Sequence, residues 1–296
     1  MDIRRILTGV SGGTASNGTA ELACRVAARF GAHLTALHVR HDIAGSVIAH
    51  GAEGLAAAEH MRRAAKKSDA VQATSETVKS AFAAAAARHN LPFEDAEPTT
   101  PGAPPAAPPA AGACWREETG DAPALLSRQA RFFDLIVLGR SDRVIDEPHS
   151  DAIEQTLTNS GRPVLLAPAE PPGAFGETIG IAWDGSDQAV RAMVAALPFL
   201  RVATNIVLVA IGAESKQDAG ELQAYLGAHE VTANLKSLPA VEGKSSGGQL
   251  LSAARDEGAD LLVLGGYGQA PWREVLFGGI TSELVDRSQL PLLLSR

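Results

Sequence analysis

The stretch LLSAARDEGADLLVLGG (250–266) decides the fold of this chain. It joins a helical pattern to a short apolar run, and the earlier stretch LLSRQARFFDLIVLGR (125–140) repeats the arrangement. In both copies an aspartate, Asp134 or Asp260, precedes the apolar run, and a glycine ends it. Short apolar strands that alternate with helices are typical of a parallel sheet buried on both faces. The sequence therefore predicts an α/β fold.

Two further pairs of stretches match in the same order. RRILTGVSGG (4–13) matches ETIGIAWDGS (177–186) at the start of the two halves, and SGRPVLLAP (160–168) matches SQLPLLLSR (288–296) at their ends. A helical pattern follows the first stretch of each half. Three ordered matches indicate an internal duplication.

The duplication predicts two doubly wound, flavodoxin-like domains, each with a five-stranded parallel sheet and right-handed crossovers. The boundary is placed in the Pro- and Gly-rich segment 168–177, which gives domains 1–170 and 171–296. In the second domain we expect strands near 178–183, 205–211, 230–237, 260–265 and 291–295.

The first half is longer than the second because of residues 43–124, which we interpret as an insertion. It holds Ala-rich helical patterns at 52–66 and 73–89, followed by PTTPGAPPAAPPAAGA (98–113). Proline at this density continues neither a helix nor a central strand, so an extended surface loop is expected. Two interpretations of this stretch stay open, a solvated loop and a partner-binding segment.

Composition narrows the class of protein. Hydrophobic residues make up 45% of the 296 residues and charged residues 20%, which predicts a globular chain. The net charge of −8 argues against nucleic acid as a partner, because clustered Lys and Arg supply that affinity. No apolar run reaches 18 residues, no leader-like segment opens the chain, and only Cys24 and Cys114 are present. We therefore expect no membrane contact and a cytoplasmic location.

A glycine-spaced loop follows the fourth expected strand of the second half. GGYGQAPWREVLFGGIT (265–281) contains the pattern G-x2-G-x9-G, from Gly265 through Gly268 to Gly278, directly before a helical pattern. Ligands of open α/β sheets bind beyond the carboxyl ends of strands, and a helix N-terminus offers N–H groups to phosphate. Glycine lets the backbone approach such a ligand, but tight turns also collect glycine. The spacing predicts a phosphate site or, in the alternative, a set of turns.

This loop, together with WDGS (183–186) at the end of the first strand, resembles the universal stress protein family. That family carries G-x2-G-x9-G-(S/T) after its fourth strand and an aspartate after its first. The resemblance covers nearly the whole chain as two copies. It implies that Asp184 contacts adenine, that Gly265 and Gly268 line the ribose and phosphates, and that 278–281 cap the phosphates. The implied nucleotide-binding set is Trp183, Asp184, Gly185, Leu264, Gly265, Gly268, Gly278, Gly279, Ile280 and Thr281.

The ligand implied by the resemblance is ATP, or AMP or ADP, with Mg²⁺ accompanying ATP, and no catalytic residue is implied. One departure concerns Gly279, which stands where the family's ATP binders have Ser or Thr. A charge-assisted hydrogen bond of about 1.5–3 kcal/mol is then missing. An N-cap or turn is the alternative role for Asp184.

The first half departs further from the pattern. Its first strand ends in Ser11, and GRSDRVIDEPHSDAIEQ (139–155) retains only Gly139. The acidic residues of that stretch would repel phosphate, and Asp151 with Glu154 is typical of a helix cap. We therefore expect no nucleotide site in the first half.

Three other functions are compatible with parts of the sequence. VSGGTASNG (10–18) resembles the SGGxDS loop of ATP pyrophosphatases, but Ala15 replaces its aspartate, which argues against adenylylation. A slow ATP hydrolase and a nucleotide-free, chaperone-like interaction protein are the remaining alternatives. The resemblance also predicts that the last strands of the two halves pair edge to edge, and that the chain forms a homodimer.

Overall fold

The computed structural model describes most of the chain in ten segments. They cover 2–11, 15–40, 75–95, 111–140, 147–211, 218–239, 241, 245–266, 283–285 and 288–296. No helix in these segments is long and apolar enough to cross a membrane.

The first half alternates strands and helices as the sequence predicts. Its elements are β1 (Arg5–Val10), α1 (Ala15–Phe30), β2 (His33–Arg40), a helix over 75–88, β3 (Phe93–Asp95), β4 (Gly112–Thr119), α4 (Ala122–Ala130), β5 (Leu135–Gly139), α5 (Glu147–Asn159) and β6 (Val164–Ala167).

The second half repeats the pattern. Its elements are β7 (Thr178–Trp183), α6 (Asp187–Leu200), β8 (Asn205–Ile211), α8 (Ala219–Ala228), β9 (Asn234–Leu238), α9 (Ser246–Asp256), β10 (Leu261–Gly265), a short helical stretch at 283–285 and β11 (Leu292–Ser295).

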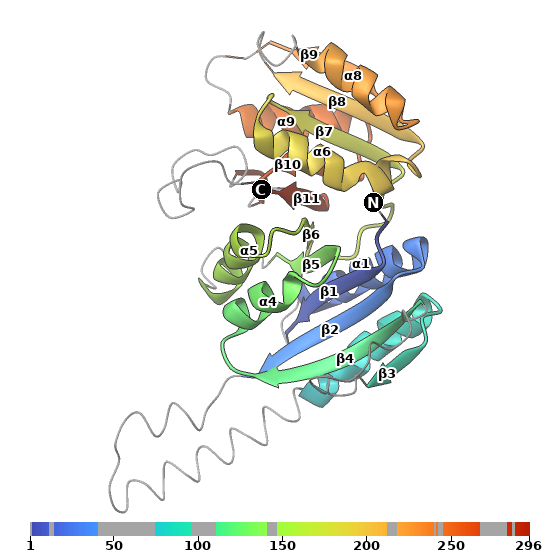
Figure 1. The fold of residues 1–296 in the computed structure, drawn as a ribbon, viewed down its shortest axis with the longest axis vertical. Helices are drawn as coiled ribbons and strands as arrows, with labels where there is room; N and C mark the ends of the chain where they lie inside the picture. The colour runs from blue at the N-terminus through green and yellow to red at the C-terminus, as the bar shows by residue number, and fades with distance from the viewer. Residues whose placement is uncertain are drawn as a thin grey trace, which may run out of the picture.

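The described strands form one 11-stranded sheet in the order β3-β4-β2-β1-β5-β6-β11-β10-β7-β8-β9. Within each half the strands pair in parallel. When the strands are counted along each half, with β3 left out, their order from the outer edge inward is 3-2-1-4-5, as in a Rossmann-like sheet, and not the 2-1-3-4-5 of flavodoxin. The two halves join where β6 and β11 pair antiparallel, with Leu165 opposite Leu293. The expected α/β fold and the expected edge-to-edge pairing of the last strands are confirmed (Figure 1).

The expectation that 43–124 is one insertion is wrong for its described parts. The helix over 75–88 and strand β4 fill the places that α8 and β9 fill in the second half, and β3 adds a sixth strand outside β4. Strand β4 was missed because it carries charged residues. Glu117 lies 2.6 Å from the Arg40 guanidinium and accepts a hydrogen bond from the Ser75 hydroxyl at 2.9 Å, so the sheet holds this carboxylate in an ion pair. The helical pattern at 52–66 and residues 98–110 lie outside the described residues.

Two smaller expectations also differ from the structure. Helix α5 begins at Glu147, so Asp151 lies inside the helix and does not cap it. Pro148 is the second residue of this helix, in the first turn, where proline is tolerated. Strand β9 begins at Asn234 instead of near residue 230, since the Val231 N–H donates to the carbonyl of Leu226 at the end of α8.

The residues that repeat between the halves hold equivalent parts of the sheet. The Asp134 carboxylate accepts hydrogen bonds from the backbone N–H groups of Arg4 and Arg5 at the start of β1. Asp260 does the same for residues 176–178 at the start of β7, at 2.8–3.3 Å. The hydroxyls of Ser160 and Ser288 likewise accept from the backbone two residues later, just before β6 and β11.

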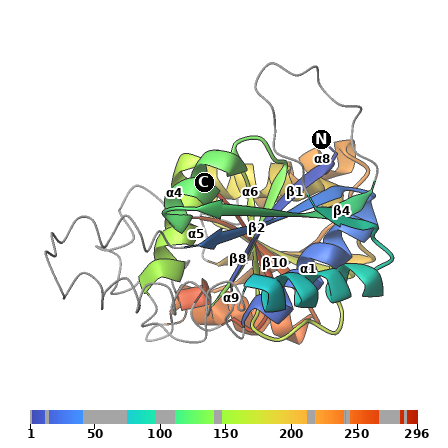
Figure 2. The same cartoon turned by 90° about the horizontal axis from the view of Figure 1, so that it is seen from below.

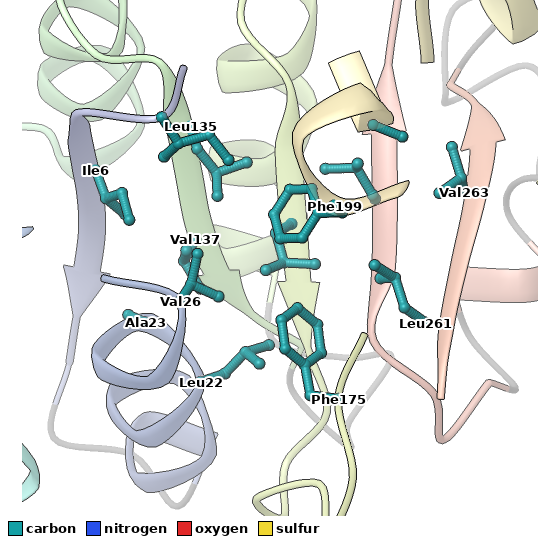
Figure 3. Close-up of a cluster of buried hydrophobic side chains, with 14 of the residues drawn as sticks. Ile6, Leu22, Ala23, Val26, Leu135, Val137, Phe175, Phe199, Leu261 and Val263 are labelled. Carbon is teal, nitrogen blue, oxygen red and sulfur yellow. The ribbon is translucent and has the colours of Figure 1, made fainter. Parts of the chain in front are cut away.

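Each face of the sheet carries a core to which both halves contribute. Helices α1, α6, α8 and the helix over 75–88 pack on one face, and α4, α5 and α9 pack on the other. Figure 2 shows α1 and the teal helix over 75–88 on the same side of β4. On the first face, the ring centroid of Phe199 in α6 lies 5.0 Å from that of Phe30 in α1. It lies 6.0 Å from that of Phe175 in the connecting segment (Figure 3). The halves therefore share an apolar core on each face of the sheet.

Candidate functional site

The candidate site lies at the carboxyl end of β7, where the strand order of the second half reverses. Ligands of open α/β sheets bind at this kind of switch point. Asp184 and Gly185 follow β7 directly and are exposed. Gly185 has a φ of +77°, which is left-handed backbone that favours glycine. The turn brings Ser186 to the N-cap of α6, where its hydroxyl accepts from the backbone N–H of Ala189.

Asp184 is held by a local turn. Its Oδ1 accepts a hydrogen bond from the Ser186 backbone N–H at 2.9 Å, as in an Asx turn. This geometry supports the turn role that the sequence left open. It leaves the exposed carboxylate in place at the strand end, so the turn role and a ligand role are compatible.

Gly265, at the end of β10, meets the first turn of α6. A Cβ at Gly265 would lie 2.8 Å from the backbone N of Ala189 and from the backbone carbonyl carbon of Gln188, a separation that real Cβ atoms do not show. Glycine at 265 is therefore required by packing alone. The same close approach places the strand end that begins the glycine loop against the helix start that follows Asp184.

The remaining predicted residues divide into two groups. Leu264 is a core residue of β10, with its side chain 3% exposed in the cluster on the α9 face. Gly268, Gly278, Gly279, Ile280 and Thr281 lie outside the described residues.

Trp183, the last residue of β7, is 7% exposed, and its indole N–H has no hydrogen-bond partner among the described residues. A buried donor is almost always paired, so an unmatched N–H beside the switch point is a group that a ligand or a water could satisfy. The indole N–H of Trp115 in β4 also has no hydrogen-bond partner among the described residues. An unmatched indole therefore does not by itself mark a nucleotide site.

Sequence reasoning missed Asp218, which lies just before α8. Its Oδ2 is 3.4 Å from the position that a Cβ would take at Gly185, so a second exposed carboxylate borders the turn that holds Asp184. No spacing in the sequence marks this residue, because the loop between β8 and α8 brings it there. The acidic pair suits a cation or the neutral base and ribose of a nucleotide better than bare phosphate.

The equivalent position of the first half is built differently. Ser11 follows β1, and β5 ends at Gly139 followed by Arg140, whose side chain is 7% exposed. The acidic residues Asp142 and Asp146 of this loop, and residues 12–14, lie outside the described residues. The first half thus has a buried arginine where the second half has Gly266, and its guanidinium donates to the carbonyls of Val285 and Leu290 in the second half.

Other groups offer little chemistry. The Cys114 thiol lies 3.3 Å from His33 Nε2 and donates to the Thr35 hydroxyl, but burial raises its pKa, so the unreactive protonated form predominates. Burial also raises the pKa of Cys24, to about 12. Among the residues that the structure describes, no three His, Cys, Asp or Glu side chains group as metal ligands.

A cavity of about 430 Å³ lies away from the switch point, between β9 and α9 at the edge of the sheet. Its lining includes Lys236, Leu238, Ser252 and Asp256, and neither Asp184 nor Gly265 borders it. The Lys236 ammonium is already paired with Glu257 at 2.5 Å. Among the predicted site residues that the structure describes, none borders this cavity, whose lining also includes Ser245 and Glu283.

No family model matches the sequence, and a search of curated proteins finds no relative. Solved structures do match. A universal stress protein from Archaeoglobus fulgidus aligns with 100% of this chain and 97% of its own, at 12% identity and a TM-score of 0.71. A functionally unknown protein from Pseudomonas aeruginosa aligns with 99% of this chain and 92% of its own, at 12% identity and a TM-score of 0.56.

A shorter universal stress protein, solved in complex with cAMP, aligns with 42% of this chain and 98% of its own, at 20% identity and a TM-score of 0.34. The full-length matches show that this chain has the fold of a two-domain universal stress protein. At this level of identity the likeness concerns the fold alone.

Proposed function

We propose that this chain is a tandem universal stress protein that binds an adenine nucleotide through its second domain only and acts as a regulatory protein of the stress response. The two domains are 1–170 and 171–296, and the ligand that fits best is ATP, accompanied by Mg²⁺. The fold supports the first part of the proposal. The local differences between the two halves support the second.

One observation carries the proposal. In the second half, β10 passes so close to the start of α6 that a Cβ at Gly265 would lie 2.8 Å from the α6 backbone, next to the helix start that follows the Asp184 turn. This is also the half with the G-x2-G-x9-G spacing. A strand end without a Cβ and an exposed carboxylate are thus brought together at the switch point, where a nucleotide is expected. The first half offers Ser11 and a buried Arg140 at the same place.

In the proposed complex Asp184 contacts the adenine, with Trp183 and Gly185 beside it. Gly265 and Gly268 line the ribose and phosphates, next to the backbone of Leu264. Gly278, Gly279, Ile280 and Thr281 cap the phosphates with backbone N–H groups at a helix start, which is the donor type that phosphate prefers. We further propose that the chain acts in the cytoplasm as a homodimer.

The proposal is tested by equilibrium binding of ATP, ADP and AMP to the wild type and to Asp184→Ala, Asp184→Asn and Asp256→Ala. Asp184→Ala should weaken binding more than tenfold. It also removes the hydrogen bond to Ser186, worth about 1 kcal/mol, so the thermal midpoint should fall by only a few degrees.

Asp184→Asn keeps an acceptor for the Ser186 N–H and should melt like the wild type, so it separates loss of the turn from loss of the carboxylate. Asp256→Ala removes an exposed carboxylate from the end of α9 and serves as the control. Unchanged affinity in Asp184→Ala would remove that residue from the site. Absence of nucleotide binding by the wild type would favour the nucleotide-free interaction protein.

A further inference from the structure

Strand β9 forms one outer edge of the described sheet, and its counterpart in the first half is covered by a further strand. When β3 is left out, β4 and β9 are both the third strand of their half, and each pairs in parallel with the second strand, β2 or β8. Beyond β4 lies β3, also parallel, whereas no described strand lies beyond β9. Figure 1 shows β3 and β9 at opposite ends of the sheet. The edge that holds a sixth strand in the first half thus has none among the described residues of the second.

Two side-chain contacts hold β3 at its edge. The Phe93 ring packs on Phe82 of the helix over 75–88, with the ring centroids 5.9 Å apart. The Asp95 carboxylate forms an ion pair with the Lys79 ammonium of the same helix at 2.6 Å. Backbone pairing with β4 is thus combined with one apolar and one charged contact to the neighbouring helix. A strand added at β9 would be fixed by contacts of the same two kinds.

The second half offers such contacts in the cavity of about 430 Å³ between β9 and α9. Strand β9 contributes Lys236 and Leu238, which are two residues apart and therefore lie on one face of the strand. Helix α9 contributes Ser252 and Ala253. Leu238 packs against the small apolar cluster that includes Ala253, so part of the lining is apolar. Because the cavity borders the edge strand, alternate side chains of a strand paired with β9 would lie over it.

The charged residues that line the cavity are Lys236, Asp256 and Glu283. The Lys236 ammonium is already paired with the Glu257 carboxylate at 2.5 Å. Asp256 is exposed at the end of α9, and the Glu283 carboxylate accepts a hydrogen bond from the Ser245 hydroxyl at 2.7 Å. Two carboxylates therefore give the cavity a negative border. A side chain with an apolar stem and a cationic end, lysine or arginine, matches this lining.

We propose that the edge of β9 and this cavity form a docking site for an extended peptide segment of a partner protein. The segment pairs through its backbone with β9, as β3 pairs with β4, and places a lysine or arginine side chain in the cavity. The stem of that side chain packs on Leu238, and its charge lies beside Asp256 and Glu283. Main-chain hydrogen bonds supply the affinity in this mode of recognition, and the side-chain cavity supplies the specificity. The site lies away from the switch point, so this inference does not depend on nucleotide binding.

The test measures binding of fluorescein-labelled heptapeptides to the full chain by fluorescence anisotropy. The probe alternates threonine and valine around a central lysine, and a matched peptide carries glutamate in place of that lysine. Two further copies of the lysine peptide are N-methylated at alternate backbone nitrogens, one at the odd positions and one at the even positions. Because only alternate N–H groups of a strand face a given neighbour, methylation should abolish binding in one of these copies and spare it in the other.

The lysine peptide should bind, and the glutamate peptide should bind about tenfold more weakly, because the cavity border repels a carboxylate. Asp256→Asn should weaken the lysine peptide about threefold, since an exposed ion pair is worth little, and should not weaken the glutamate peptide. Ser252→Trp fills the cavity from α9 and should weaken both peptides about tenfold or more. Glu221→Gln removes an exposed carboxylate from α8, on the other face of the sheet, and should match the wild type.

Amide hydrogen exchange supplies a structural readout, since the lysine peptide should slow exchange across 234–238 and leave β1 unchanged. Equal binding by the two N-methylated peptides, or no binding by the lysine peptide, would overturn strand pairing at β9. Binding that is unchanged in both Asp256→Asn and Ser252→Trp would overturn the role of the cavity. Exchange at 234–238 that slows with protein concentration alone would assign the edge to a second copy of this chain and overturn the partner peptide.

Discussion

The two halves of the sheet share several residues that hold the fold and differ in most of the residues around the proposed nucleotide site. Asp134 and Asp260 bind the start of the first strand in each half, and Ser160 and Ser288 form the same turn before the last strand. At the switch points the agreement ends. The second half has a turn at Asp184 and glycine at 266, whereas the first has Ser11 and a buried Arg140.

The two halves thus keep one architecture with different residues at the strand ends, which supports the proposal that the second half alone binds a nucleotide. Backbone amides at the start of the first strand have a carboxylate acceptor in both copies, and a hydrogen bond to a charged acceptor is stronger than one to a neutral group. Gly265 is required by packing in the second half, whereas Arg140, one residue beyond the matching Gly139, donates to two carbonyls of the second half.

We expect the largest loss of stability from substitutions of glycines whose Cβ position lies against the backbone of another segment. In Gly18→Ala the new methyl group would lie 2.4 Å from the Pro168 carbonyl oxygen, where α1 crosses the end of β6. Because the obstructing atoms are backbone, we expect the unfolding free energy to fall by about 3 kcal/mol or more, measured by urea denaturation. In Gly265→Ala the contact is 2.8 Å, and a loss of about 2 kcal/mol is expected.

Gly227→Ala is the control for both substitutions. Gly227 lies in α8, and no heavy atom of the described residues comes within 4 Å of the place that the new methyl group would take. Alanine there should raise stability by about 0.5–1 kcal/mol through helix propensity. If Gly18→Ala were as stable as the wild type, the close packing of α1 on the end of β6 would be disproved.

Gly279→Ser tests the proposed ATP site of the second half. It restores the hydroxyl that the resemblance places after the last glycine of the loop, and we expect ATP to bind more tightly by about 1–2 kcal/mol. The same substitution should leave the urea midpoint within error of the wild type. Weaker ATP binding by this variant, measured by calorimetry, would show that 279 needs glycine for its backbone.

The smallest effect is expected in the Pro/Ala-rich stretch of the first half. Removing residues 101–108 shortens the connection between β3 and β4 by half, which changes the loop-closure term by only about 0.6 kcal/mol. Removing 98–113 is different, because it takes away Gly112 and Ala113, which pair with β2. The short deletion should melt like the wild type and the long one well below it, and equal midpoints would contradict the place of β4 in the sheet.

The sequence predicts most of the second half. Its five strands, the glycine at 265 and the turn at Asp184 follow from apolar runs and turn residues that act locally. In the first half, β4 was not predicted because charged side chains interrupt its apolar pattern. Glu117 of β4 is stabilised there by an ion pair with Arg40 of β2, a contact between strands that local sequence does not reveal. Asp218 and the reach of Arg140 were missed for the same reason, since both depend on contacts between segments distant in the chain.

The central claim is that one half binds a nucleotide and the other does not. Isothermal titration calorimetry of ATP into the wild-type chain, with Mg²⁺ present, measures the number of sites directly. The account predicts one nucleotide per chain, and Asp184→Ala should lower the affinity of that single site. Two nucleotides per chain, or one nucleotide whose affinity is unchanged in Asp184→Ala, would contradict it.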